Sequence, residues 1–402
     1  TWLNGPLITF VQIAFNLSDV ASFLVPVCFY LAYLVFPLPA TLLARRIGLR
    51  RGLVVALAIM AAGTLLFGEC VNGRWYAGAL SGLSVIGAGL SLLQITVNPY
   101  VSLLGDHDRA AQRIAIMGIA NKFAGIVAPV LFALIVMPDV GQVVANISHT
   151  PAGPVRDAVL TQFTHAVHVP YQVMAGLLVL LAILVARAPL PEITLDAAEP
   201  QGAPARKAQP VWLLTGVFAM FLYVGVEVMA GDAIGLFGHS FGLSLDITKY
   251  LTALTLASMM LGYLVGMIIV PRFISQDGYM LTCCLLGIVI CLVALVAPGL
   301  IPVFCVALLG FANAMILPAL FRIVLAEAGS DGAKATAFLV MAYSGGAVLP
   351  QIFVHIAPIL GNLHAFMALV IPAYIFIAGW SLALRAKTGG PAPESLIISA
   401  GD

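Results

Sequence analysis

The chain has 402 residues, of which 62% are hydrophobic and only 9% are charged, and its formal net charge is +1. Soluble domains carry about 25% charged residues, so this composition excludes a soluble enzyme or binding domain. The nearly neutral charge gives no reason to expect a nucleic-acid partner. The solvent for most of the surface must be lipid, and we expect an integral protein of the bilayer.

Apolar runs of about the length of a membrane span recur along the chain between short polar breaks. They are continuous rather than alternating, which indicates helices and not the strands of a barrel. The predicted helices cover residues 1–16, 20–44, 51–71, 76–104, 112–137, 171–188, 211–237, 247–271, 279–297, 300–326, 334–358 and 364–386. The first run is shorter than a span, so we expect the sequence to begin inside its first helix. The fold class is an all-α membrane protein with twelve transmembrane helices.

Residues 189–210 are rich in proline, alanine and charge, and they follow the sixth predicted helix. They are typical of a flexible linker. We therefore expect a six-helix bundle over 1–188, a cytoplasmic linker over 189–210, and a second six-helix bundle with a short cytoplasmic tail over 211–402.

The two predicted bundles share a sequence pattern. Gly125-x-x-x-Pro129 in the fifth helix matches Gly346-x-x-x-Pro350 in the eleventh. Two further features repeat at equal spacing: Lys122 and Tyr343 stand seven residues before these prolines, and Gln94 precedes Pro99 by five as Asn313 precedes Pro318. The pattern predicts pseudo-symmetric halves, an architecture that places a substrate site between them.

Basic residues set the predicted orientation. Of the 18 lysines and arginines, Lys122 lies inside a helix, and Arg74, Arg156 and Lys249 lie on one side of the membrane. The remaining fourteen lie on the side of the linker and of both termini. The positive-inside rule therefore predicts cytoplasmic termini, in a bacterial inner membrane.

The break at 138–170 carries His149, His165 and His168, which we expect to be solvated rather than bound to a metal. The six cysteines have no metal-ligand spacing and are expected to be small apolar residues. We also find no nucleophile–base pattern and no phosphate-binding loop. We therefore predict no metal, no cofactor and no enzyme activity.

Three charged residues fall well inside predicted helices: Lys122 in the fifth, and Glu227 and Asp232 in the seventh. A charge at mid-bilayer costs about 2.5–3.5 kcal/mol on insertion scales, so each should face a cavity or a partner. We predict that Lys122 pairs with one of the carboxylates across the two halves and that this pair is tied to the transport cycle. The alternative is a static pair that locks the helices together. The sequence leaves open which carboxylate is the partner.

Amides and aromatic rings also lie within the predicted helices. Amides can bond sugar hydroxyls as donors and as acceptors, and flat rings suit the C–H face of a sugar. The predicted sugar-binding residues are Gln94, Asn98, Asn121, Asn313, Gln351 and Asn4 among the amides, and Trp2, Tyr223 and Tyr343 among the aromatics. The alternative for each amide is a hydrogen bond between helices, worth about 1 kcal/mol.

Several segments resemble known transporters. Residues 39–52, which include Arg45-Arg46 and Arg50-Arg51-Gly52, resemble the cytoplasmic loop motif of the major facilitator superfamily. Four others are similar to its fucose–galactose–glucose symporter family: Thr1-Trp-Leu-Asn4-Gly5, Gln94-Ile-Thr-Val-Asn98-Pro99-Tyr100, Asn121 after Arg113-Ile-Ala-Ile-Met, and Phe221-Leu-Tyr-Val-Gly225-Val-Glu227. The resemblance implies cation-coupled uptake of a hexose or related sugar by alternating access. The sequence is more similar to the glucose/galactose and N-acetylglucosamine branch than to the fucose branch.

The chain departs from the fucose branch at two positions. That branch has acidic residues where this chain has Gly5 and Gln94. We therefore expect coupling to have moved to Lys122 with Glu227 or Asp232. Because a lysine can take the place of a bound Na⁺, H⁺ is the expected coupling ion, with Na⁺-coupled or uncoupled transport as alternatives.

The sequence thus predicts a monomeric transporter in the lipid bilayer that imports glucose, galactose, N-acetylglucosamine or a similar sugar. One rival is a carrier for organic anions or drugs with the same fold. The binding site of an anion carrier should contain unpaired cations, whereas that of a drug exporter should contain fewer amides. The other rival is a membrane enzyme or a receptor, and the sequence has no reactive cluster and no room for a signalling domain.

Overall fold

The computed structural model describes residues 2–104, 110–151, 153–194, 210–270, 273–327 and 332–388. Most of the predicted linker, residues 195–209, lies outside this part of the chain. Every regular element within the described ranges is a helix, as the continuous apolar runs predict.

The N-terminal half, as used below, comprises ten helices within the described ranges. They are α1 (Asn4–Phe15), α2 (Asp19–Ser22), α3 (Leu24–Val35), α4 (Pro37–Ile47), α5 (Leu49–Asn72), α6 (Tyr76–Leu103), α7 (Ala110–Val136), α8 (Val140–His149), α9 (Pro154–His165) and α10 (His168–Arg187).

In the described part of the chain, the C-terminal half comprises ten further α-helices and one short 3₁₀-helix. They are α11 (Pro210–Asp232), α12 (Ile234–Ser240), α13 (Leu245–Thr248), α14 (Leu251–Ile269), α15 (Gln276–Val296), α16 (Ile301–Asn313), α17 (Ile316–Glu327), α18 (Gly332–Met341), η3 (Ala342–Ser344), α19 (Gly345–Leu360) and α20 (Asn362–Thr388).

Ten spans within the described ranges are long and apolar enough to cross a membrane. An eleventh forms if Asp19–Val35 and Pro37–Ile47, which meet at a bend of 54°, are taken together. The short apolar helix α1 stands where the first of the twelve predicted helices was expected. The all-α membrane fold is confirmed.

Proline explains two interruptions that the apolar runs do not show. The predicted helix over 300–326 is broken between Asn313 and Ile316. The ring of Pro318 clashes with the carbonyl four residues earlier, at Ala314, and Pro318 offers no N–H to it. The bend between α3 and α4 lies at Phe36, directly before Pro37, which has no N–H to donate to the carbonyl of Tyr33 four residues earlier.

The prediction of a non-helical break over 138–170 is wrong, since α8, α9 and the start of α10 occupy most of it. A helix does not need an apolar run when part of its surface meets water, so hydropathy alone missed these segments. Two of the histidines there bond neighbouring polar groups. His168 Nε2 lies 2.8 Å from Glu69 Oε1, and His165 Nδ1 lies 2.9 Å from Asn72 Oδ1.

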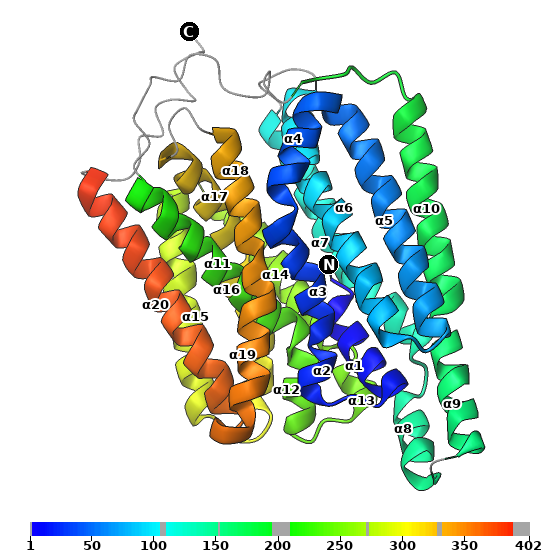
Figure 1. Ribbon diagram of the computed structural model, residues 1–402. Helices are drawn as coiled ribbons and strands as arrows, with labels where there is room; N and C mark the ends of the chain where they lie inside the picture. The colour runs from blue at the N-terminus through cyan, green and yellow to red at the C-terminus, as the bar shows by residue number, and fades with distance from the viewer. Residues whose placement is uncertain are drawn as a thin grey trace.

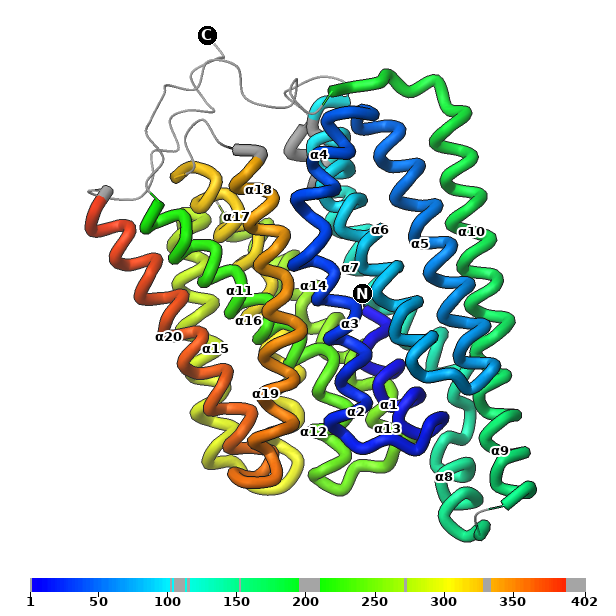
Figure 2. The backbone as a smooth tube through the Cα atoms, viewed as in Figure 1, coloured from blue at the N-terminus to red at the C-terminus, as the bar shows by residue number. Residues whose placement is uncertain are grey.

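The two halves stand side by side, with α8 and α9 at the end of the molecule opposite the last residues of α10 and the first residues of α11 (Figure 1). These two ends are called the α8 end and the linker end below. Helix α7 packs against α14, and α3 packs against α19 along the boundary between the halves (Figure 2).

The repeated glycines lie at matching close contacts. A Cβ on Gly125 would come within 2.8 Å of the Trp2 ring, beside the start of α1, and a Cβ on Gly346 within 2.8 Å of Val228 on α11. In each half the glycine of the Gly-x-x-x-Pro segment thus lets its helix approach the first helix of the same half. The sequence repeat therefore marks a repeated helix contact.

Candidate functional site

Lys122 and Glu227 form an ion pair between the two halves, with Lys122 Nζ 3.5 Å from Glu227 Oε1. Both residues are 8% exposed. The ammonium group also lies 3.2 Å from Met259 Sδ, 4.5 Å from the centre of the Trp2 ring and 5.2 Å from that of Tyr263. The cation is therefore enclosed by a carboxylate, a thioether and two aromatic faces, all of which attract it.

The partner of Lys122, which the sequence left open, is thus Glu227. Burial of the pair costs several kcal/mol of desolvation per ion, which attraction within the pair has to offset. If Glu227 loses its charge, Lys122 is left buried with no carboxylate at salt-bridge distance among the described residues. The ion pair therefore joins α7 of one half to α11 of the other.

Five described tyrosines lie within electrostatic range of the Glu227 carboxylate: Tyr30, Tyr223, Tyr263, Tyr343 and Tyr374. Tyr223 and Tyr343 were predicted from the sequence, whereas Tyr30, Tyr263, Tyr374 and the nearby Met259 were not. A single tyrosine or methionine in an apolar helix carries no periodic signal that separates a site from ordinary packing.

Asn313 is the last residue of α16, directly before the break that Pro318 causes, and it is 1% exposed. The Tyr223 hydroxyl donates to its main-chain oxygen at 3.0 Å, and the Tyr374 hydroxyl donates to its Oδ1 at 2.7 Å. Two tyrosines therefore hold one predicted sugar-binding amide.

Asp232 is buried at the end of α11, and it lies beside the side chain of Asn4 and the backbone of Gly5. Among the described residues, neither Asp232 Oδ2 nor Asn4 Nδ2, both buried, has a hydrogen-bond partner. A Cβ on Gly5 would come within 2.2 Å of Thr252 Oγ1, so α1 meets α11 and α14 closely here. The two seventh-helix carboxylates consequently have different surroundings: Glu227 faces a lysine, and Asp232 faces an amide.

The other predicted residues are more scattered. On α6, Gln94 is half-buried and Asn98 is exposed, while Asn121 is exposed on α7. Gln351 Nε2 donates to the main-chain oxygen of Val20 at 3.5 Å, which joins α19 to α2. The structure brings Lys122, Tyr223, Asn313 and Tyr343 together near the Glu227 carboxylate. The Trp2 ring lies against Lys122.

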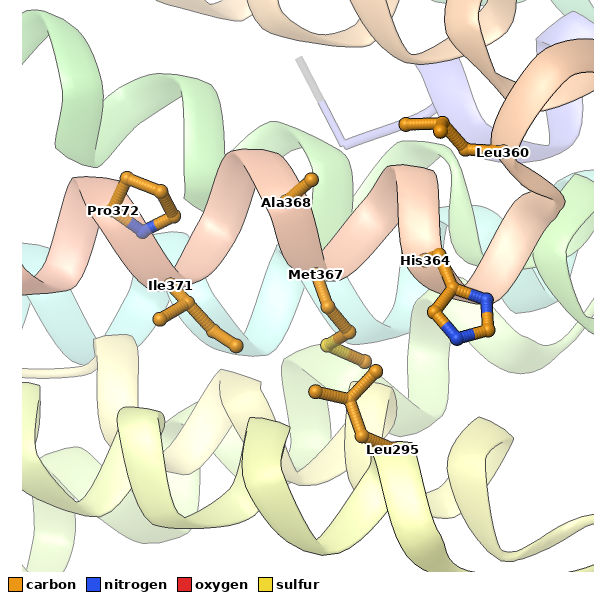
Figure 3. Close-up of a pocket in the computed structure, with 7 residues that line it drawn as sticks. All are labelled: Leu295, Leu360, His364, Met367, Ala368, Ile371 and Pro372. Carbon is orange, nitrogen blue, oxygen red and sulfur yellow. The ribbon is translucent and has the colours of Figure 1, made fainter.

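A separate groove lies on α15, α19 and α20 (Figure 3). Its lining residues are Leu295, Leu360, His364, Met367, Ala368, Ile371 and Pro372. Among these side chains only His364 offers a strong hydrogen-bonding group, so the groove lacks the paired donors and acceptors that sugar hydroxyls need.

Comparison with known proteins identifies transporters as the relatives of this chain. The sequence profile described as Major Facilitator Superfamily matches residues 1–350. The chain is 30% identical over 389 residues to a protein of Brucella abortus named glucose/galactose transporter, covering 95% of this chain and 90% of that protein. It is 24% identical to the L-fucose-proton symporter of Escherichia coli, covering 93% of this chain and 86% of that protein.

Two solved structures share the fold. One is the major facilitator transporter FucP in the outward conformation, with a TM-score of 0.71, 21% identity, and coverage of 95% of this chain and 94% of that one. The other is a D-xylose-proton symporter, with a TM-score of 0.63, 14% identity, and coverage of 94% and 95%.

These findings and the fold define the class: the chain is an integral membrane protein of a transporter superfamily. It belongs to the major facilitator superfamily and, within it, to the fucose–galactose–glucose:cation symporter family.

Proposed function

We propose that this chain imports a hexose or amino sugar, such as glucose, galactose or N-acetylglucosamine, by alternating access coupled to H⁺. The observation that carries the proposal is the buried Lys122–Glu227 pair, which joins the halves within a cluster of tyrosines and amides. The names of the relatives, glucose/galactose transporter and L-fucose-proton symporter, support this substrate class and coupling ion.

The proposed sugar site lies between the halves, next to this pair. Asn313, Gln94, Asn98 and Asn121 would bond sugar hydroxyls, with Asn4 and Gln351 as further amides. Trp2, Tyr223 and Tyr343 would offer ring faces. This division of roles follows from chemistry, because hydroxyls need paired donors and acceptors and the C–H surface of a sugar needs flat apolar partners.

The proposed coupling rests on Lys122, Glu227 and Asp232. Protonation of Glu227 would remove the attraction that holds α7 to α11, whereas an ionised Glu227 would restore it. A fixed lysine cation beside the carboxylate takes the position that a bound Na⁺ would need, so the arrangement favours H⁺. Symport of one positive charge would add about 2.3 kcal/mol of driving force per 100 mV, roughly a 50-fold accumulation.

We further propose that the protein acts as a monomer in the bacterial inner membrane, with its termini and the linker end in the cytoplasm. The distribution of lysine and arginine supports this orientation. Cysteine labelling from each side of the membrane tests this orientation, at an introduced residue near Gly153 and at one near Ala188. Labelling of the Gly153 variant from the cytoplasmic side would reverse the assignment.

Uptake into proteoliposomes tests the function. Glucose, galactose, fructose, fucose and N-acetylglucosamine are each supplied with an imposed H⁺ gradient, an imposed Na⁺ gradient, or neither, to the wild-type protein and to Lys122→Ala. We expect one or two sugars to accumulate only with the H⁺ gradient, and we expect the variant merely to equilibrate them. Accumulation with the Na⁺ gradient alone would show that Na⁺ is the coupling ion. If no sugar of the panel is transported or competes for transport, the proposed substrate class is wrong.

A further inference from the structure

We infer that Tyr374 of α20 is a positioning residue for the sugar: its hydroxyl fixes the side-chain amide of Asn313 so that the amide presents N–H donors to the substrate. This inference rests on the proposed function, with Asn313 as a sugar-binding residue. Tyr374 lies in α20, a helix in which the sequence predicted no site residue.

The hydrogen bonds of Asn313 define what it can offer a ligand. Asn313 has two oxygens, and each accepts from a tyrosine: the main-chain oxygen from Tyr223 at 3.0 Å and Oδ1 from Tyr374 at 2.7 Å. An asparagine side chain has one acceptor oxygen and one NH₂ group. With Oδ1 engaged by Tyr374, the NH₂ group remains for a ligand.

Tyr374 is itself held in place. Its ring packs on Gly287 of α15, where a Cβ would come within 2.6 Å of the ring Cζ. Tyr374 is fully buried, and it lies within electrostatic range of Glu227. A fixed ring gives its hydroxyl a fixed direction, so the orientation of the Asn313 amide is set from outside the sugar site.

An amide held in one orientation discriminates among sugars. Without Tyr374 Oη, the side chain of Asn313 can rotate by about 180° and exchange donor for acceptor. Sugar epimers, such as glucose and galactose, differ in the direction of one hydroxyl, so a fixed donor favours one of them. Loss of the hydroxyl should therefore weaken binding of the preferred sugar and reduce its advantage over the epimer.

The experiment uses the full-length transporter in proteoliposomes, with uptake kinetics for glucose and galactose. The variants are Tyr374→Phe, Asn313→Ala and the double variant. Tyr374→Phe keeps the ring on Gly287 and removes only the hydroxyl. Tyr171→Phe is the matched control, because Tyr171 is a buried tyrosine of the other half whose ring packs on Phe67.

For Tyr374→Phe we expect KM of the preferred sugar to rise about 5-fold, the effect of one hydrogen bond. We expect the maximal rate to change by less than about 2-fold, and the KM ratio of the two sugars to move toward one. In the Asn313→Ala background, Tyr374→Phe should change KM no further, because the tyrosine acts through the amide. Tyr171→Phe should leave both sugars unchanged.

Three results would overturn the inference. Tyr374→Phe could behave like Tyr171→Phe while the wild type transports, or it could lower only the amount of folded protein at an unchanged KM ratio. The effects of Tyr374→Phe and Asn313→Ala on KM could also prove additive. By contrast, a wild-type protein that neither moves nor binds a sugar of the panel would remove the proposed function, and this inference with it.

Discussion

Among the described residues, charged side chains of the C-terminal half meet different kinds of group at the centre of the molecule and at its α8 end. At the centre, Glu227 of α11 meets a side chain, the ammonium group of Lys122. At the α8 end, Lys249 Nζ donates to the main-chain oxygen of Met137 at 2.9 Å, and the Gly141 N–H donates to Asp246 Oδ2 at 3.2 Å.

The contacts at the α8 end match the polarity of two helix termini. Met137 directly follows the end of α7, whose free carbonyls carry partial negative charge, and Gly141 lies in the first turn of α8, where N–H groups carry partial positive charge. Lys249 and Asp246 also pair with each other at 3.1 Å. A Cβ on Gly141 would come within 2.5 Å of Asp246 Oδ2, so the contact leaves no room for a side chain there.

The difference between the two places is instructive. A bond to a main-chain group exists only while the helix end that carries it stays in position, so the α8-end contacts depend on one placement of the halves. The central pair joins two flexible side chains, and its strength depends on protonation. We therefore expect variants at the α8 end to change which conformation is populated, and central variants to change coupling.

The largest effect is expected at the centre. Lys122→Met should leave Glu227 buried without its partner and lower stability by about 3–5 kcal/mol, because half of a buried pair is costly. The double variant Lys122→Met with Glu227→Gln should recover most of the stability but still equilibrate sugar without accumulating it. Thermal unfolding in detergent and gradient-driven uptake measure the two effects.

Arg74→Met is the control for this prediction, because Arg74 forms an exposed ion pair with Asp157 within the N-terminal half. It should change stability by less than about 1 kcal/mol. Accumulation of sugar by the double variant would show that the central pair is a static lock.

A smaller effect is expected at the α8 end. Lys249→Met should remove a charged hydrogen bond to Met137, worth about 1.5–3 kcal/mol, and populate conformations in which α13 is separated from α8. Gly141→Val should act in the same direction through its clash with Asp246. Distances between spin labels on α8 and α13, measured by pulsed EPR, should lengthen in both variants. Unchanged distances with unchanged transport would mean that these contacts do not hold the halves together.

Loss of a single neutral hydrogen bond should have a smaller effect than the variants above. Tyr223→Phe removes the donor to the main-chain oxygen of Asn313 and should cost about 1 kcal/mol of stability. Thermal unfolding should show it, with Tyr171→Phe as a buried tyrosine for comparison. A loss as large as that of Lys122→Met would indicate that Tyr223 supports the central pair itself.

The smallest effect is expected in the apolar groove of α15, α19 and α20. His364→Ala should leave KM for sugar and the accumulation ratio within about 2-fold of the wild type, because the groove offers a sugar no set of hydrogen-bond partners. Uptake kinetics check this, and a large rise in KM would place the sugar outside the cluster around Glu227.

The sequence by itself determined the class of fold, because uncharged apolar runs must form helices in lipid and basic residues gather beside their ends. It also identified Lys122, Glu227 and Asp232, since a charge inside an apolar run requires a partner. The Gly-x-x-x-Pro repeat likewise marked the close helix contacts at Gly125 and Gly346.

Tertiary structure alone decided the pairings. Glu227 and Asp232 lie on one helix five residues apart, and only the tertiary structure brings Lys122 of α7 to one and Asn4 of α1 to the other. Tyr263 and Tyr374 became part of the cluster in the same way, because an isolated tyrosine in an apolar helix acquires a role from whatever it faces. Periodicity and hydropathy describe each helix against its solvent, whereas a site consists of contacts between helices.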